Sequence, residues 1–314
     1  MPGSEIAVAA EGLTRLYGEQ MAVDHISFEV HRGEIFGFLG PNGAGKTTTQ
    51  RMLTGVLPPS EGHGYVLDHD MVHDPLGAKE HIGVVPEAAN PYLELSGWGN
   101  LMLFGELYGV PRRRRQERGE ALLREFDLWE RRHDRVRAYS KGMRQRLMLA
   151  IALVHEPEAL FLDEPTSGLD VASRRLIHSI VRRLASEGAA VFYTTHNIEE
   201  ANLLCDRVAI ICRGRLAAVD SPEALKTAFA DSQAVEVAFA SPLDLEELPA
   251  LPQVTRAEKQ GDRLCLYTSS PGAVVAHVVD LARERDLEII ALSTLGPSLE
   301  EVFLRLTESG DEAS

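Results

Sequence analysis

The chain has 314 residues, of which 44% are hydrophobic and 25% charged, and its formal net charge is −15. This composition is that of a globular protein with room for two domains, and it excludes a fibrous repeat or a largely disordered chain. The acidic balance excludes nucleic acid as the main partner, because binding by counterion release requires a basic face.

The sequence shows neither a membrane-spanning segment nor a signal peptide. No apolar run approaches the roughly 20 residues needed to span a bilayer. The start, Met1–Glu5, lacks the basic and apolar regions of a signal peptide. Three widely separated cysteines form no C-x-x-C pair, so neither a zinc framework nor a disulfide framework is predicted. We therefore expect a cytoplasmic protein.

The first elements predict a glycine-rich loop between a buried strand and a helix. Apolar and polar residues alternate in Ile26–Val30, which is typical of a half-buried strand. The continuous apolar run Ile35–Leu39 predicts a strand that is buried on both faces. After a glycine-rich turn, a helix is expected from about Lys46, and Gly55 is a stop signal for it.

Strands and helices then alternate, which predicts a mainly parallel sheet covered by helices. A mostly helical insertion between Gly97 and Leu128 interrupts them, and we expect a separate helical lobe over about residues 97–155. The later strands are expected at Ala159–Leu162, Ala190–Tyr193 and Val208–Ile211, and the helices between them at Val171–Ser186 and Asn197–Leu204.

The pattern restarts after Ser221-Pro222, which divides the chain into residues 1–230 and residues 231–314. The order β-α-β-β-α-β-α, with a weak first helix near Leu243–Leu248, predicts a small α+β domain of ferredoxin-like fold. Its strands are expected at Ala234–Phe239, Val254–Lys259, Leu264–Tyr267 and Leu287–Leu292, and its later helices at Pro271–Arg283 and Ser298–Leu306. Its core is expected to contain Val235, Val237, Phe239, Leu264, Leu266, Ile289 and Ile290.

The segment from Gly40 to Thr47 fits the phosphate-binding pattern G-x-x-x-x-G-K-T, in the strand–loop–helix context that this motif requires. Its glycines let backbone amides face phosphate oxygens, Lys46 reaches the β- and γ-phosphates, and the hydroxyl of Thr47 is available to Mg²⁺. The alternative is a glycine-rich turn with an incidental Lys-Thr. The predicted nucleotide-binding residues here are Gly40, Pro41, Asn42, Gly43, Ala44, Gly45, Lys46, Thr47 and Thr48.

Two carboxylates, Asp163 and Glu164, follow a buried strand at the edge where ligand crevices open in α/β sheets. Asp163 is a candidate Mg²⁺ ligand, and Glu164 is the candidate that orients or deprotonates the attacking water. The alternative interpretation is a solvated acidic turn.

Together with Tyr139–Arg146, Ser167–Asp170 and Thr195-His196, these two motifs resemble the nucleotide-binding domain of ABC transporters over about residues 6–220. The resemblance implies a P-loop NTPase fold with a helical lobe, and ATP and Mg²⁺ as cofactors. It also implies a head-to-tail dimer in which the helix that Ser140 caps binds the ATP of the other subunit. The residues that it assigns to this second half of the site are Ser140, Gly142 and Asp170.

The same resemblance gives roles to two residues that carry little signal alone. His196 would contact the γ-phosphate and hold the surroundings of the attacking water, although a lone His is more often structural or solvated. Tyr17 would stack on adenine, although a Tyr before a turn is commonly a packing residue.

The sequence departs from the family pattern at two places. Lys141 and Met143 replace the first Gly and the Gln of the usual Ser-Gly-Gly-Gln. In the loop Val84–Glu87, Glu87 stands where the family has a Gln that contacts Mg²⁺ and water. A carboxylate also coordinates Mg²⁺ but adds negative charge, so we expect Glu87 to be a metal and catalytic residue with altered metal dependence.

Both departures and the segment 297–304 resemble ATPase subunits of type-2 ABC exporters of the daunorubicin-resistance kind. This implies an ATP-hydrolysing subunit at the inner face of the cell membrane that energises a separate integral membrane permease and exports a drug-like or lipophilic substrate. Two alternatives stay open at this point: a soluble ABC ATPase not engaged in transport, and a P-loop kinase acting on a small molecule. The run Arg112–Arg115 is interpreted as a solvated helical face, with contact to lipid or permease as the alternative.

Overall fold

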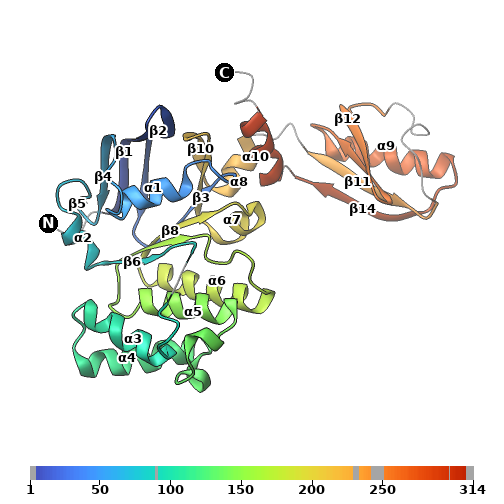
Figure 1. The fold of residues 1–314 in the computed structure, drawn as a ribbon. Helices are drawn as coiled ribbons and strands as arrows, with labels where there is room; N and C mark the ends of the chain where they lie inside the picture. The colour runs from blue at the N-terminus through green and yellow to red at the C-terminus, as the bar shows by residue number, and fades with distance from the viewer. Residues whose placement is uncertain (1–4, 89–90, 229–232, 242–250, 297, 309–314) are drawn as a thin grey trace. The chain divides into compact units, whose positions relative to one another are not determined.

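The computed structural model describes residues 5–88, 91–228, 233–241, 251–296 and 298–308 (Figure 1). The chain divides into two compact units, Met1–Asp220 and Ser221–Ser314. The boundary predicted between residues 230 and 231 lies outside the described residues. In the described part of the chain, no helix is long and apolar enough to cross a membrane.

The first unit is built on a six-stranded sheet in the order β10-β9-β3-β8-β7-β6. All neighbours are parallel except β9 and β10, so the predicted mainly parallel sheet is confirmed. Each residue of β3 is buried, as the continuous apolar run predicted. The strands are β3 (Ile35–Leu39), β6 (Ile82–Val85), β7 (Ala159–Asp163), β8 (Ala190–Thr195), β9 (Arg207–Cys212) and β10 (Arg215–Asp220).

A second, antiparallel sheet in the order β2-β1-β4-β5 shares the core of this unit, and only part of β2 was predicted. Phe28 of β2 stacks on Phe36 of β3 and Phe192 of β8, with ring centroids 5.3 and 5.9 Å apart. These contacts join the two sheets through aromatic packing. The strands are β1 (Ile6–Tyr17), β2 (Gln20–His31), β4 (Glu61–Val66) and β5 (His69–Asp70).

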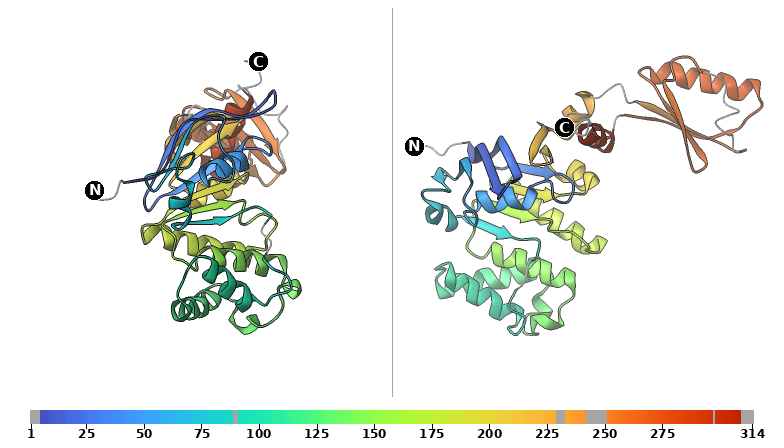
Figure 2. Two further views of the ribbon diagram at one scale, coloured as in Figure 1. Left: turned by 60° about the vertical axis from the view of Figure 1, so that its left-hand side comes forward. Right: turned by 45° about the horizontal axis from the view of Figure 1, so that its top comes forward.

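Helices cover the parallel sheet and form the predicted helical lobe. Figures 1 and 2 show α3 and α4 at the end of this unit that lies away from β1, β2 and β4. The expected loop Val84–Glu87 needs a correction: Val84 and Val85 end strand β6, because they pair in parallel with β7, and only Pro86 and Glu87 follow it. The helices are α1 (Lys46–Leu53), α2 (Pro75–Lys79), α3 (Gly97–Leu107), α4 (Arg112–Glu125), α5 (Lys141–Ala152), α6 (Val171–Ser186) and α7 (Ile198–Leu204).

The second unit contains an antiparallel sheet in the order β12-β13-β11-β14, and α9 packs on it (Figure 2). The helix expected near Leu243–Leu248 lies outside the described residues. Ile289 packs against the core, whereas Ile290 is 67% exposed, so its predicted place in the core is wrong: adjacent strand residues face opposite sides. The elements are α8 (Pro222–Ala228), β11 (Ala234–Phe239), β12 (Arg256–Gln260), β13 (Arg263–Tyr267), α9 (Pro271–Glu284), β14 (Ile289–Leu295) and α10 (Leu299–Glu308).

Candidate functional site

The loop between β3 and α1 has the backbone geometry of a phosphate cradle. Gly43 and Gly45 have φ angles of +80° and +111°, which disfavour residues with a side chain. A Cβ atom on Gly40 would lie 2.5 Å from the carbonyl oxygen of Ile211, and one on Gly45 would lie 2.7 Å from that of Ala22. Because α1 begins at Lys46, its first amide groups have no acceptor within the helix and are available to an anion.

Lys46 folds back over this loop. It is only 6% exposed, and its Nζ donates hydrogen bonds to the carbonyl oxygens of Gly40 at 2.8 Å and Pro41 at 3.2 Å. Its charge is therefore held at the centre of the loop, where phosphate oxygens would lie.

Asp163 and Glu164 stand at the carboxyl end of β7, next to the end of β8. The Asp163 side chain is buried, and its Oδ1 accepts a hydrogen bond of 2.5 Å from the hydroxyl of Thr194. Glu164 has a φ angle of +48°, and its amide donates to the Thr194 hydroxyl at 3.1 Å. A positive φ at a residue other than Gly costs about 1 kcal/mol or more and persists only where its surroundings impose it. Here it marks the turn from which the Glu164 side chain leaves the strand.

The Glu164 carboxylate links the loop with His196. Its Oε2 lies 2.8 Å from Nδ1 of His196, and its Oε1 lies 3.5 Å from Nζ of Lys46. Glu164 is 8% exposed, and Oε1 is buried yet accepts no hydrogen bond from any described residue. His196 is half-exposed at the end of β8. A buried acceptor without a donor is costly, so Oε1 is poised for a ligand proton.

A cavity of about 270 Å³ opens beside this group and combines the loop with two of the three predicted carboxylates. Glu87 reaches it from the segment after β6, the neighbour of β7. His196 lines a smaller hollow of about 150 Å³ that shares Glu164 with it. The lining residues of the larger cavity are Ala22, Asn42, Gly43, Gly45, Lys46, Thr47, Thr48, Glu87 and Glu164.

Tyr17 does not line this cavity. It ends β1 with 45% of its surface exposed, and the Arg15 guanidinium lies 4.9 Å from its ring centroid.

Ser140, Gly142 and Asp170, which the resemblance assigns to the second half of the site, form a separate group. Ser140 caps α5 by accepting a hydrogen bond from the amide of Met143 at 3.2 Å. Asp170 caps α6 by accepting hydrogen bonds from Ser173. The bond from the Ser173 backbone amide makes the largest contribution to lowering the pKa of the Asp170 carboxyl. A Cβ atom on Gly142 would lie 2.7 Å from the Ser173 hydroxyl oxygen, so the starts of α5 and α6 are in contact. Ser140, Gly142 and Asp170 do not line the cavity beside Lys46.

Sequence reasoning missed Glu200, which is buried on α7 behind His196. It accepts hydrogen bonds from the side chains of His178, Tyr193, Thr166 and Thr195 at 2.7, 2.9, 2.5 and 2.8 Å. Burial alone would raise the pKa of its carboxyl, but these hydrogen bonds together outweigh burial and lower that pKa from its usual 4.5. The available signal is a Glu within the predicted helix Asn197–Leu204, to which the sequence motifs assign no role.

This fold and this loop define a P-loop nucleotide-binding protein. The profile of the ABC transporter family matches residues 23–167. The chain is 40% identical over 305 residues to the Nod factor export ATP-binding protein I of Rhizobium sp. (strain N33), covering 97% of this chain and 98% of that one. It is 38% identical to the daunorubicin resistance ATP-binding protein DrrA3 of Streptomyces coeruleorubidus, covering 98% of each.

A solved structure of the ATP binding subunit of an ABC transporter superposes with a TM-score of 0.67 at 29% identity, covering 71% of this chain and 93% of that one. The chain therefore belongs to the family of ABC transporter ATP-binding proteins, and it is an ATP-binding ATPase. The resemblance to drug-export ATPases predicted from the sequence is confirmed.

Proposed function

We propose that this chain hydrolyses MgATP in the cavity beside Lys46 and thereby energises a separate permease that exports a drug-like or lipophilic substrate. The observation that carries the proposal is the position of the Glu164 carboxylate, which lies within reach of both Lys46 and His196 at the edge of the cavity. The site thus places the cation of Lys46, which would bind phosphate, beside the Glu164 carboxylate, whose Oε1 accepts no hydrogen bond from a described residue.

The chain offers a matching set of groups for the triphosphate and its metal. The free amides at the start of α1 and the Nζ of Lys46 would bind phosphate oxygens. Thr47, Asp163 and Glu87 provide the hydroxyl and carboxylate oxygens that Mg²⁺ prefers. When bound, Mg²⁺ neutralises phosphate charge. Glu87 and Glu164 both line the cavity, so this site carries one more negative charge than a site with Gln at position 87.

The hydrolytic role falls to Glu164 and His196. Once a bound triphosphate takes Lys46 as its counter-ion, Oε1 of Glu164 would accept a proton from the attacking water. His196, bonded to Oε2, would keep the carboxylate in one orientation and face the γ-phosphate. Tyr17, exposed at the end of β1, would stack on the adenine ring.

We also propose that two copies form a head-to-tail dimer around two ATP molecules. Support comes from the separation of the site into two groups within one chain: Ser140, Gly142 and Asp170 lie away from the Lys46 cavity. An isologous dimer would bring the start of α5 of one copy to the Lys46 cavity of the other. Because the dimer has two-fold symmetry, the same contact would form at both cavities.

The permease would dock on the helical lobe, and the whole assembly would lie at the inner face of the cell membrane. Five large apolar side chains between residues 92 and 108 are exposed to solvent. Exposed apolar side chains that gather in one region are typical of a surface that binds a partner. The five are Tyr92, Leu93, Leu95, Leu107 and Tyr108. The printed names of the relatives support export, since they are proteins of Nod factor export and of daunorubicin, doxorubicin and linearmycin resistance.

The test is isolation of the full-length chain from membranes, with identification of the integral membrane protein that accompanies it. Leu107→Glu should reduce the recovery of that protein at least fivefold and leave hydrolysis by the isolated chain unchanged. Val56→Glu is the matched control, because Val56 and Leu107 are both 68% exposed. Recovery of the active chain without any integral membrane protein would contradict the transport function.

For the second unit we propose a regulatory or dimer-stabilising role. The second unit has a hydrophobic core made by its own residues, on β11, β13, α9 and their neighbours. The residues that line the Lys46 cavity all belong to the first unit.

A further inference from the structure

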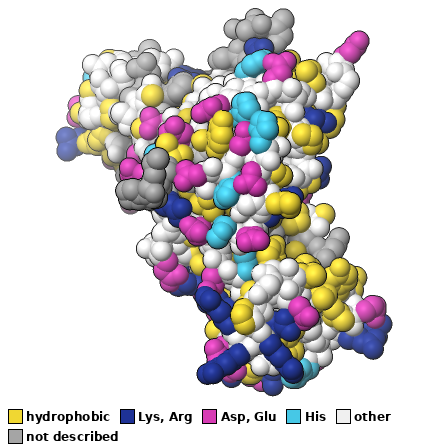
Figure 3. Space-filling model, turned by 90° about the vertical axis from the view of Figure 1, so that its left-hand side faces the viewer, with side chains coloured by type: hydrophobic (Ala, Val, Ile, Leu, Met, Phe, Trp, Pro, Cys, Tyr) yellow, Lys and Arg dark blue, Asp and Glu magenta, His cyan; other side chains and the backbone are white. Residues whose placement is uncertain are grey.

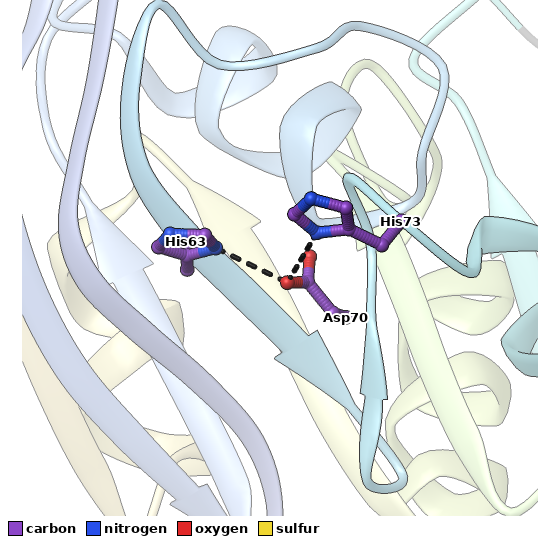
Figure 4. A group of neighbouring side chains, drawn as sticks. All are labelled: His63, Asp70 and His73. Carbon is purple, nitrogen blue, oxygen red and sulfur yellow. Dashed lines mark hydrogen bonds and ion pairs between the residues drawn. The ribbon is translucent and has the colours of Figure 1, made fainter.

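Two histidines and an aspartate converge on one face of the antiparallel sheet, outside the nucleotide cavity. His63 lies on β4, Asp70 ends β5, and His73 lies in the turn that follows. Figure 4 shows both imidazole rings directed at the Asp70 carboxylate. Oδ2 of Asp70 lies 3.1 Å from Nδ1 of His63 and 2.8 Å from Nδ1 of His73.

The backbone explains why these side chains meet. Asp70 is the antiparallel partner of Tyr65, so it shares a face with Tyr65 and with His63, two residues earlier. The turn after β5 then wraps around Asp70. Its Oδ1 accepts from the amide of Val72 at 2.7 Å, which fixes the carboxylate and leaves Oδ2 to the two imidazoles. The fold therefore fixes the Asp70 carboxylate between the two histidines.

The spacing fits a small metal ion. A ligand atom from each of the three residues lies within 4.8 Å of the other two. In a tetrahedral site with metal–ligand bonds of about 2.0–2.1 Å, ligand atoms are about 3.3 Å apart, close to the two observed distances. The third distance, between the nitrogens of the two imidazoles, is at most 4.8 Å, so an ion would fit between the three donors once the two rings turn toward each other.

We propose that His63, Asp70 and His73 bind one first-row divalent metal ion of the zinc type, with water completing the coordination. Two imidazoles and one carboxylate suit Zn²⁺, Ni²⁺, Co²⁺ or Cu²⁺, whereas Mg²⁺ and Ca²⁺ prefer oxygen donors alone. All three side chains are partly exposed, at 45%, 21% and 72%, so an ion has access from solvent.

The local charge is suitable for a cation. Asp70 supplies a carboxylate, which is ordinarily negative at neutral pH. Glu11 of β1 pairs with His63 in the sheet and is a second acidic group on this face. Figure 3 shows histidines interspersed with acidic side chains across the surface here.

The competing interpretation is that the histidines only donate hydrogen bonds to Asp70. A metal and the ring protons compete for the same nitrogen atoms, so the two interpretations differ in what a titration shows. The hydrogen-bonded cluster takes up no ion. The metal site releases protons and ties β4, β5 and the following turn together. None of the three residues lines the cavity beside Lys46, so the site would stabilise the fold without supporting hydrolysis.

The experiment is a Zn²⁺ titration of the chelator-treated, nucleotide-free full-length chain, read by equilibrium dialysis and by the visible absorption of bound Co²⁺. At Zn²⁺ concentrations that saturate the wild-type site, the wild-type chain should bind one more ion than the His63→Gln or His73→Gln chain. Each substitution should lower the affinity for that ion at least tenfold. Comparison with these variants separates this ion from any held by the carboxylates near Lys46 or by the cysteines.

His69→Gln is the matched control, because His69 makes a similar bond of 2.7 Å to Asp74 but is outside the three-residue group. It should keep the ion and the Co²⁺ spectrum. ATP hydrolysis by the His63 and His73 variants shows that they fold. Equal Zn²⁺ uptake by the wild type and the His63→Gln and His73→Gln variants, or equal loss of the ion in the His69→Gln variant, would overturn the proposal.

Discussion

Nζ of Lys46 and Oε1 of Glu164 lie 3.5 Å apart, which links the phosphate loop to the carboxyl end of β7. Both side chains are almost fully buried, at 7% and 8% exposure. In a poorly solvated site, each of two such opposite charges compensates the other, and removal of one leaves the other buried without a counter-ion. A bound triphosphate would take Lys46 as its own counter-ion and leave the Glu164 carboxylate to act on water.

Lys46→Ala should weaken nucleotide binding, because the loop loses its only lysine. The loss of a charge-assisted hydrogen bond of about 2 kcal/mol corresponds to about a 30-fold higher Kd. Calorimetric titration with a non-hydrolysable ATP analogue measures this. Lys226→Ala is the control, since Lys226 pairs with Glu223 on α8. An unchanged Kd in the Lys46 variant would exclude the proposed phosphate contact.

Mixed dimers test the composite site. A Ser140→Arg chain combined with a Lys46→Ala chain forms one intact site from Lys46 of the first and Ser140 of the second, whereas either variant alone forms none. Equal mixing should restore about a quarter of the wild-type rate if sites act independently. Ser140→Thr, which keeps a capping hydroxyl, should stay active. Verified mixed dimers without activity would argue against the head-to-tail arrangement.

The sequence predicted the elements that carry strong local signals. The P-loop, β7 with its two carboxylates and α6 follow from motif context and apolar periodicity, and Val171–Ser186 is α6 in full. β1, β4 and β5 escaped prediction, because strands of an antiparallel sheet with irregular register show little alternation.

The positions of site residues relative to one another follow from pairing across distant segments. The Thr194 hydroxyl meets Asp163 because β7 and β8 are neighbours in the sheet. The buried hydrogen bonds of Glu200 to α6 and β8 have the same origin, and no spacing along the chain indicates them.

Glu200→Ala should destabilise the fold by about 3 kcal/mol, because several buried donors lose their acceptor. Glu200→Gln should cost less. The pKa of Glu200 is lowered in the folded chain, so its stabilisation is fully present above the usual 4.5 and is lost as pH falls through the lower folded value. Denaturant unfolding should therefore show a wild-type advantage over Glu200→Gln that is constant near neutral pH and shrinks below about pH 4.5. A pH-independent difference would contradict the ionised carboxylate.

A chain that ends at Asp220 should keep its nucleotide affinity within about twofold, because the described residues of the cavity lie in the first unit. It should associate more weakly with itself, as seen by sedimentation with and without ATP. Loss of ATP binding in a shortened chain that remains folded would show that the second unit helps to build the site.

The most direct test of the proposed mechanism is phosphate release by the full-length chain and its Glu164→Gln variant, with Mg²⁺ present and with Mg²⁺ chelated, and with ATP binding measured in parallel. The wild-type chain should hydrolyse ATP only with Mg²⁺ present. The Glu164→Gln variant should retain ATP binding but hydrolyse ATP more slowly by roughly 100-fold or more, because the neutral amide cannot take a proton from water. Equal rates in the two chains would contradict the assignment of Glu164, and with it the account of how this site hydrolyses ATP.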